Sequence, residues 1–256
     1  MIHPTAIIDP TATVDDSCEI GPYAVIGADV TIGQRTRVGP HAVVNGPTVI
    51  GEDNHIFQFA SIGEDPQDLK FDGLDSRLEI GNKNRIREFV TINRGTKGGG
   101  GVTSIGDDNL VMAYVHIAHD CIVGNNTVFA NSASLAGHVT VGDFAILGGF
   151  SLVHQFSRIG AHSFSGMGSV INKDVPPYLL VSGHYAESKG INKQGLKRRG
   201  FDDKEIAALQ KTFLRVVRRR GVKGEEAYTE VEQLADEFPH VKNLLSFIRA
   251  EGRGMV

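Results

Sequence analysis

Residues 114–121, "YVHIAHDC", place two histidines, an aspartate and a cysteine within one short stretch. Such a stretch could bind a metal, supply a catalytic base with a carboxylate helper, or decorate a surface. Histidine is the usual general base near neutral pH, and an adjacent carboxylate can hold its tautomer. The choice depends on which side chains point inward, so the elements that position them come first.

The chain is built on a hexapeptide repeat. An apolar residue, nearly always aliphatic, recurs at every sixth position from Ile2 to Ile62, from Ile80 to Ile92 and from Ile105 to Ile171, with Ser165 as an exception. This period fits neither an amphipathic helix nor simple strand alternation and is typical of hexapeptide repeats. Three hexads close one coil, and the first and fifth positions of each hexad point inward. We therefore predict a mainly β fold, a parallel β-helix, and the resemblance to hexapeptide proteins implies that it is left-handed.

Two interruptions and a change of pattern divide the chain. Loops leave the β-helix near residues 66–78 and 94–104, and both are candidates for substrate-site loops. The glycine-rich second loop could equally be a flexible lid, and plain insertions are tolerated in surface loops. After Pro176 and Pro177 the repeat fades and helix signals begin, with Asp202 and Glu205 as a capping box. We predict a β-helix over residues 1–186 and a small α-helical domain over residues 187–256.

The register answers the question of orientation. Cys121, like Cys18, falls on an inward position, whereas His119 and Asp120 fall on outward ones. Residues three hexads apart stack on neighbouring coils, about 4.8 Å apart. One outward strip thus collects six candidate site residues, which are His119, Asp120, Gly137, His138, His154 and Gln155, and His116 lies one turn away along the chain.

This strip favours base-assisted attack by a substrate hydroxyl. His119 is the candidate base, Asp120 its orienting partner, and Gly137 offers a bare backbone N–H for an oxyanion. No serine lies on the strip and Cys121 points inward, so we expect no covalent intermediate. We expect no metal and no cofactor, although a trimeric zinc enzyme resembling hexapeptide carbonic anhydrases, with three histidines across a subunit interface, is an alternative.

Composition limits the compartment and the partners. The chain has 256 residues, two cysteines and a net charge of −4, and we see no disulfide framework, signal peptide or transmembrane segment. We expect a cytoplasmic enzyme that binds no nucleic acid. The segment 187–256 holds 15 Lys and Arg against 11 Asp and Glu, so it is the part expected to meet an acidic partner.

Several motifs resemble one family along the whole chain. They are "NGPTVIGEDNHIFQFASIGEDPQDLK", "IGNKNRIREFVTINRGT", "HIAHDCIVGNN", "LAGHVTVGDFAILGG", "VHQFSRIGAHS" and "NKQGLKRRGF". Together they resemble the bacterial acyl-carrier-protein:UDP-N-acetylglucosamine O-acyltransferases of lipid A biosynthesis. The resemblance implies a homotrimer with active sites between subunits. It also implies transfer of an (R)-3-hydroxyacyl group from acyl carrier protein to the 3-hydroxyl of UDP-N-acetylglucosamine, the first step of that pathway.

The resemblance also assigns roles. His119 matches the general base, Asp120 its partner, and Gly137 the oxyanion donor. His116, His138, His154 and Gln155 match substrate-positioning residues. Asp68 and Lys70 match groups that hold the sugar nucleotide from the neighbouring subunit, while Asn192 and Arg198 match nucleotide and phosphate contacts. The carrier protein could meet a basic set made of Lys197, Arg199, Arg215, Arg218, Arg219 and Arg220, which could equally be a solvated helix face.

This sequence departs from the family at three places. Asn93 stands where the family often has histidine. The stretch "GHYA", with His184 and Tyr185, stands where many members have "GNHA" or "GNPA". Met167 lies where the family has its acyl-chain ruler and other members carry glycine, so we predict a donor of about ten to twelve carbons, since overlong chains would clash.

Other readings remain open. They are the sister N-acyltransferase of the same pathway, which carries an additional N-terminal domain, a coenzyme-A-dependent acetyltransferase, and a non-enzymatic scaffold. The sequence does not fix whether the acceptor sugar bears a 3-hydroxyl or a 3-amino group.

Overall fold

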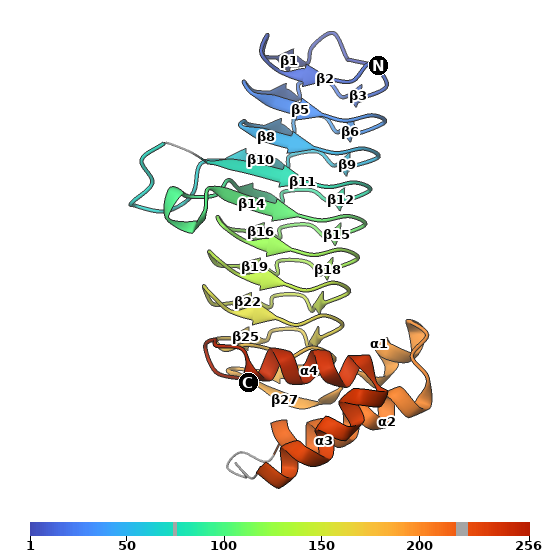
Figure 1. Ribbon diagram of the computed structural model, residues 1–256. Helices are drawn as coiled ribbons and strands as arrows, with labels where there is room; N and C mark the ends of the chain where they lie inside the picture. Colours follow the sequence, from blue (N-terminus) through green and yellow to red (C-terminus); the bar gives the residue numbers. More distant parts are fainter. Residues whose placement is uncertain (74–75, 219–224) are drawn as a thin grey trace.

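The computed structural model describes residues 1–73, 76–218 and 225–256. It is an elongated prism of stacked coils with a helical domain at its C-terminal end (Figure 1). Three sheets form the sides of the prism, and their strands pair in parallel with the strands of the neighbouring coils, except for the last strand, β27 (Ala186–Ile191), which pairs antiparallel with β26 (Leu179–Gly183). The predicted fold class, a left-handed parallel β-helix followed by a small helical domain, is confirmed.

The three sheets follow one another around each coil. The first sheet contains β1 (Ile7–Ile8), β4 (Val25–Ile26), β7 (Val43–Val44), β10 (Ser61–Glu64), β13 (Thr91–Asn93), β16 (His116–Ile117), β19 (Ser134–Leu135), β22 (Leu152–Val153) and β25 (Val170–Ile171). The second contains β2 (Thr13–Val14), β5 (Val30–Ile32), β8 (Thr48–Ile50), β11 (Arg77–Ile80), β14 (Val102–Ile105), β17 (Ile122–Val123), β20 (Thr140–Val141) and β23 (Arg158–Ile159). The third contains β3 (Glu19–Ile20), β6 (Arg37–Val38), β9 (His55–Ile56), β12 (Arg85–Ile86), β15 (Leu110–Val111), β18 (Val128–Phe129), β21 (Ile146–Leu147), β24 (Phe164–Ser165), β26 (Leu179–Gly183) and β27 (Ala186–Ile191).

The inward positions of the repeat form the core. Ile56, Ile86 and Ile117 are fully buried, and the small residues at the fifth position, such as Cys18 and Cys121, are buried beside them. Stacking like residues on successive coils buries a continuous apolar column that one coil could not bury alone. Both cysteines are therefore core residues, as predicted.

The corners of the prism hold the outward residues that matter for chemistry. We name them by the sheets they join: corner 1–2 contains residues 119–120 and 137–138, corner 2–3 contains 161–162, and corner 3–1 contains 113–114 and 167–168. Non-glycine residues there adopt left-handed backbone, including Asp120 (φ 59°) and His138 (φ 62°). This conformation costs about 1–2 kcal/mol per residue, and the stacked coils hold it in place, since the His138 N–H donates to the His119 carbonyl at 3.0 Å.

Two loops leave the prism at corner 1–2 and project from the same side (Figure 1). Ser61 pairs with Thr91, and Thr91 pairs with His116, so both of these coils are longer than the three hexads of an uninterrupted one. The first insertion lies between β10 and β11, and the second lies between β13 and β14. Both return the chain to the same corner, so the later coils keep their register.

The C-terminal domain begins with a hairpin. Strand β27 pairs antiparallel with β26, so strand structure continues past residue 186 and helices begin at Lys193. A capping box of Asp202 and Glu205 opens the second helix, as predicted. The helical segments are α1 (Lys193–Arg198), α2 (Asp203–Thr212), the π-helical turn η2 (Phe213–Val217), α3 (Glu225–Glu237) and α4 (Pro239–Arg249). Within the described ranges, no helix combines the length and the apolar character needed to cross a bilayer.

Candidate active site

His119 and Asp120 form a hydrogen-bonded pair at corner 1–2. His119 Nδ1 lies 2.8 Å from Asp120 Oδ2, and the two side chains are 14% and 0% exposed. An ionised carboxylate can only accept, so Nδ1 carries the proton and donates it to the hydrogen bond. The other ring nitrogen, Nε2, then has a free lone pair. This tautomer is the one that a general base needs.

The glycine-rich loop covers the Asp120 carboxylate. The Thr96 backbone N–H donates to Oδ1 at 2.7 Å, and the Thr96 hydroxyl donates to Oδ2 at 2.6 Å. The Asp120 backbone N–H is bound in turn by Thr103 Oγ1 at 2.8 Å. Asp120 therefore points out of the prism, as predicted, and is nevertheless buried, because residues of the second insertion close over it.

Gly137 lies directly against the His119 ring. A Cβ at this position would be 2.5 Å from His119 Cε1 and 2.8 Å from Nε2, which is closer than real Cβ contacts allow. Within the described part of the chain, the Gly137 N–H has no hydrogen-bond acceptor. Glycine here therefore makes room for the imidazole, and its amide is available to an oxyanion.

His138 and His116 flank the pair on two sides. His138 Nε2 lies 3.6 Å from Asp120 Oδ2, and the ring stands edge-on to His119 at 5.1 Å. His116 Nδ1 lies 2.7 Å from the Thr91 hydroxyl. Burial lowers the pKa of His116, and the nearby His119 lowers it further, so His116 is neutral near pH 7 and can bind through hydrogen bonds rather than charge.

His154 and Gln155 lie on the following coil and are exposed. His154 Nδ1 is 3.1 Å from the Gln155 carbonyl. They continue the strip toward the C-terminal domain, about one coil spacing beyond Gly137. The structure thus brings His116, His119, Asp120, Gly137, His138, His154 and Gln155 to one edge.

Three of these residues have metal-ligand potential. His119, Asp120 and His138 offer one ligand atom each, all within 4.8 Å of one another, and they form the one such group found among the described residues. A zinc ion needs a free lone pair on each ligand atom, which can be a histidine nitrogen, a cysteine sulfur or a carboxylate oxygen. Here Asp120 Oδ2 accepts from both Thr96 and His119, which fits a base-orienting carboxylate better than a ligand.

Asp68 and Lys70 lie on the first insertion, between β10 and β11. Asp68 Oδ1 accepts the Lys70 backbone N–H at 3.0 Å, and Leu69 between them is fully exposed. The base of the loop is tied to the second insertion, because Arg94 pairs with Asp65. Asn93, at the position where the family often has histidine, donates from Nδ2 to the Asp65 carbonyl at 2.8 Å and so has a structural role in this anchor.

Asn192, Arg198 and Met167 lie at other corners. Asn192 donates to the His162 carbonyl at corner 2–3 (3.1 Å) and caps α1 by accepting the Gly195 N–H. Arg198 is exposed in the last turn of α1. Met167 is 81% exposed at corner 3–1. Within a single chain, therefore, neither the expected nucleotide contacts, Asn192 and Arg198, nor the expected ruler, Met167, lies at the corner that holds His119. Of the basic set, Arg219 and Arg220 lie outside the described residues.

Sequence reasoning missed several residues of the site. Phe156, which stacks on His138 at 4.3 Å, follows it by three hexads and could have been found from the repeat. Thr91 pairs with His116 across a longer coil, and the insertion hides this pairing. Thr96 lies inside that insertion, where the repeat gives no register.

Known proteins resemble the chain over its whole length. A family described as Udp N-acetylglucosamine O-acyltransferase, Domain 2, matches residues 174–256, and the bacterial transferase hexapeptide family matches residues 11–46 and 103–137. The acyl-(acyl-carrier-protein)–UDP-N-acetylglucosamine O-acyltransferase of Ectopseudomonas mendocina is 54% identical over 99% of this chain and 98% of its own length. Its counterpart in Janthinobacterium sp. is 51% identical over 100% and 99%.

A solved structure agrees with these relatives. The UDP-N-acetylglucosamine O-acyltransferase of Moraxella catarrhalis superposes with a TM-score of 0.95 at 46% identity, over 100% of this chain and 99% of that one. These matches cover the whole of this chain or nearly so, and thus both the β-helix and the helical domain. The chain therefore belongs to the UDP-N-acetylglucosamine O-acyltransferase family, whose members are acyltransferases.

Proposed function

We propose that this protein transfers a 3-hydroxyacyl group from acyl carrier protein to the 3-hydroxyl of UDP-N-acetylglucosamine, as the first step of lipid A biosynthesis in the cytoplasm. The observation that carries the proposal is the pair of His119 and Asp120 packed against the bare Gly137 backbone. Its relatives, at about half identity over their full length, carry the name of this reaction.

The reaction follows from the positions of three groups. His119 Nε2 takes the proton from the sugar hydroxyl as its oxygen attacks the thioester carbonyl. The Gly137 N–H donates to the oxyanion that forms. When the carbonyl reforms, the C–S bond breaks, and the proton on His119 passes to the departing thiolate. Asp120 keeps its hydrogen bond to His119 Nδ1 and stabilises the imidazolium.

The surroundings favour direct transfer over a covalent intermediate. Cys121 is the nearest thiol in sequence, but its side chain is fully buried and burial raises its pKa to about 12. A thiol in this state is not a nucleophile at neutral pH.

The distribution of site residues supports a homotrimer with shared active sites. Asn192 and Arg198 belong to corner 2–3 and the helical domain, whereas His119 belongs to corner 1–2, and the two corners border the second sheet. Neighbouring copies that meet along this sheet would bring the two sets together. An exposed aromatic ladder on corner 3–1 is a further surface for a second copy to cover; it contains Tyr23, His41, Phe59, Phe89 and Tyr114.

Met167 supports selection of an acyl chain of about ten to twelve carbons. The outer face of the first sheet runs between corner 1–2 and corner 3–1, and it carries the exposed Leu152. Met167 projects at the far edge of this face, and its Cγ is 4.0 Å from the place of a Cβ on Gly149. An acyl chain that follows the face would end against Met167, so a longer chain would clash.

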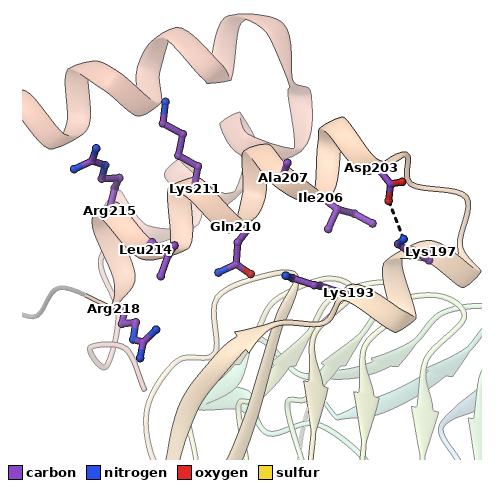
Figure 2. Close-up of a pocket in the computed structure, with 10 residues that line it drawn as sticks. All are labelled: Lys193, Lys197, Asp203, Ile206, Ala207, Gln210, Lys211, Leu214, Arg215 and Arg218. Carbon is purple, nitrogen blue, oxygen red and sulfur yellow. Dashed lines mark ion pairs between the residues drawn. The ribbon is translucent and has the colours of Figure 1, made fainter.

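The basic hollow of the helical domain supports docking of the acidic carrier protein. It has a volume of about 1010 Å³ and is lined by residues of α1, α2 and η2, and five cationic side chains line it together with Asp203 (Figure 2). Lys197 pairs with Asp203 at 2.8 Å. The five cations are Lys193, Lys197, Lys211, Arg215 and Arg218.

The test is a defined transfer assay. The purified protein should acylate UDP-N-acetylglucosamine from mixed 3-hydroxyacyl carrier proteins, with mass spectrometry identifying the product. His119→Ala should abolish turnover while the oligomer and the melting temperature persist, and His3→Ala, at an exposed histidine of the first coil, should not. Full turnover by His119→Ala would overturn the mechanism. Transfer only to a 3-amino sugar would favour the sister N-acyltransferase reaction.

A further inference from the structure

We infer that Thr96 is a positioning residue for the reaction, and that the glycine-rich loop serves to lock the Asp120 carboxylate onto His119. The inference rests on the proposed base role of His119. The loop lies between β13 and β14, outside the repeat, and none of its residues belongs to the histidine strip.

Thr96 engages both oxygens of one carboxylate. Its backbone N–H binds Oδ1 at 2.7 Å and its hydroxyl binds Oδ2 at 2.6 Å. With Oδ1 held by Thr96, the carboxyl plane cannot rotate freely, and Oδ2 faces His119 Nδ1 at 2.8 Å. Hydrogen bonds to a charged group are short and strong, and they are stronger where water is excluded, as around this fully buried carboxylate.

The hydrogen bonds form a continuous chain. The Gly99 N–H donates to Thr96 Oγ1 at 3.2 Å. That hydroxyl proton is therefore directed to Asp120 Oδ2, and Asp120 in turn accepts the His119 Nδ1 proton. The carboxylate accepts both protons, and because Thr96 holds Oδ2 against His119 Nδ1, the ring keeps its Nδ1–H tautomer and leaves Nε2 to face the substrate.

Two adjacent glycines of the loop differ in how closely they approach the Asp120 carboxylate. A Cβ on Gly99 would overlap the carboxylate of Asp120, whereas a Cβ on Gly98 would meet nothing within 4 Å. Neither residue has the left-handed backbone that would strain an alanine. Gly99 is therefore required for contact with the carboxylate, while Gly98 tolerates a side chain.

The competing orientation of the carboxylate explains why a lock is needed. His138 Nε2 lies 3.6 Å from the same Oδ2 and is a second ring that the carboxylate could bind. Without the Thr96 hydroxyl, Oδ1 remains on the Thr96 backbone N–H, but Oδ2 loses the bond that holds it toward His119 and can shift toward His138. A wrong tautomer leaves the geometry intact and still costs catalysis.

The experiment compares two pairs of variants in the full chain, with steady-state kinetics in both substrates. Thr96→Val keeps the shape and the backbone N–H but loses the hydroxyl, and Thr96→Ser keeps the hydroxyl. Thr96→Val should lower kcat on the order of 10- to 100-fold with little change in either KM, and Thr96→Ser should restore most of it. Gly99→Ala should lower kcat similarly, and Gly98→Ala should stay within about twofold of the parent.

A spectroscopic readout separates positioning from folding. In protein labelled with ¹⁵N-histidine, the His119 ring should show the Nδ1–H tautomer in the parent and in Thr96→Ser, and a mixture in Thr96→Val. Equal kinetics for Thr96→Val and the parent, with His119→Ala inactive, would overturn the inference and leave the proposed function standing. Activity in His119→Ala would overturn the proposed function itself.

Discussion

The contact between Gly137 and His119 gives the sharpest test of the site. In Gly137→Ala, the new Cβ would be 2.5 Å from His119 Cε1 and 2.8 Å from Nε2, against about 3.5–4.0 Å for an optimal contact. To restore such a contact, the ring must move by about 1 Å. The backbone cannot absorb this, because the His138 N–H holds the His119 carbonyl at 3.0 Å. The ring would therefore leave its 2.8 Å hydrogen bond to Asp120 or turn Nε2 away from the substrate.

A displacement of this size costs about 100-fold in rate when it moves a reacting group. We expect Gly137→Ala to lower kcat by about that factor. The melting temperature should stay within a few degrees, because Gly137 has no left-handed backbone and the atoms that its Cβ would meet belong to the His119 ring, which can turn. Gly98→Ala is the matched control, since its Cβ meets nothing within 4 Å. The reasoning fails if Gly137→Ala keeps at least half of the parent's kcat, or if its activity falls only with its melting temperature.

Four further predictions concern other parts of the molecule. Met167→Gly should extend activity to longer acyl donors in a competition assay read by mass spectrometry; an unchanged product distribution would refute the ruler. Thiol reagents should leave the native Cys121 unmodified and Cys121→Ala active, since the thiol is buried and its pKa is raised to about 12; rapid labelling would contradict this. Arg218→Glu should raise the KM for carrier protein several-fold, with a smaller effect at high salt; a salt-independent KM would argue against docking there. Burial, helped by nearby cations, lowers the pKa of His162 to about 4, so its unfolded form binds a proton first, and the free energy of unfolding should fall from about pH 6.5 to pH 4. For a partly exposed ring this amounts to on the order of 1 kcal/mol, and His162→Phe should remove that component in denaturation curves.

The repeat made most of the fold predictable. Its period determines which side chains face the core, and a single shift would turn buried residues such as Ile117 toward solvent. The same register predicts that His119 points outward and lies beside Gly137. The helical domain was predictable in outline because its capping box is local, with Asp202 and Glu205 within one helical turn of each other.

The sequence could not show what the insertions do. Thr96 approaches Asp120 from a loop whose path depends on tertiary contacts, such as the one between Arg94 and Asp65. Burial of the Asp120 carboxylate follows from that path and not from its outward position in the hexad. Likewise, strand structure continues beyond residue 186 because β27 pairs with β26 in a hairpin. This pairing forms although the hexapeptide pattern has ended, so the repeat could not predict it.

Because both insertions depart from and rejoin one edge of the prism, this architecture can gain new segments in only two ways. An added set of three hexads lengthens the column and leaves every following side chain on its own side. An insertion of any other length must form a loop that leaves the prism and returns to the same corner. The long segments from Ser61 to Thr91 and from Thr91 to His116 contain such loops. New loops in such a scaffold can therefore arise only at its corners, and the corner that holds both loops in this protein is the one that holds His119.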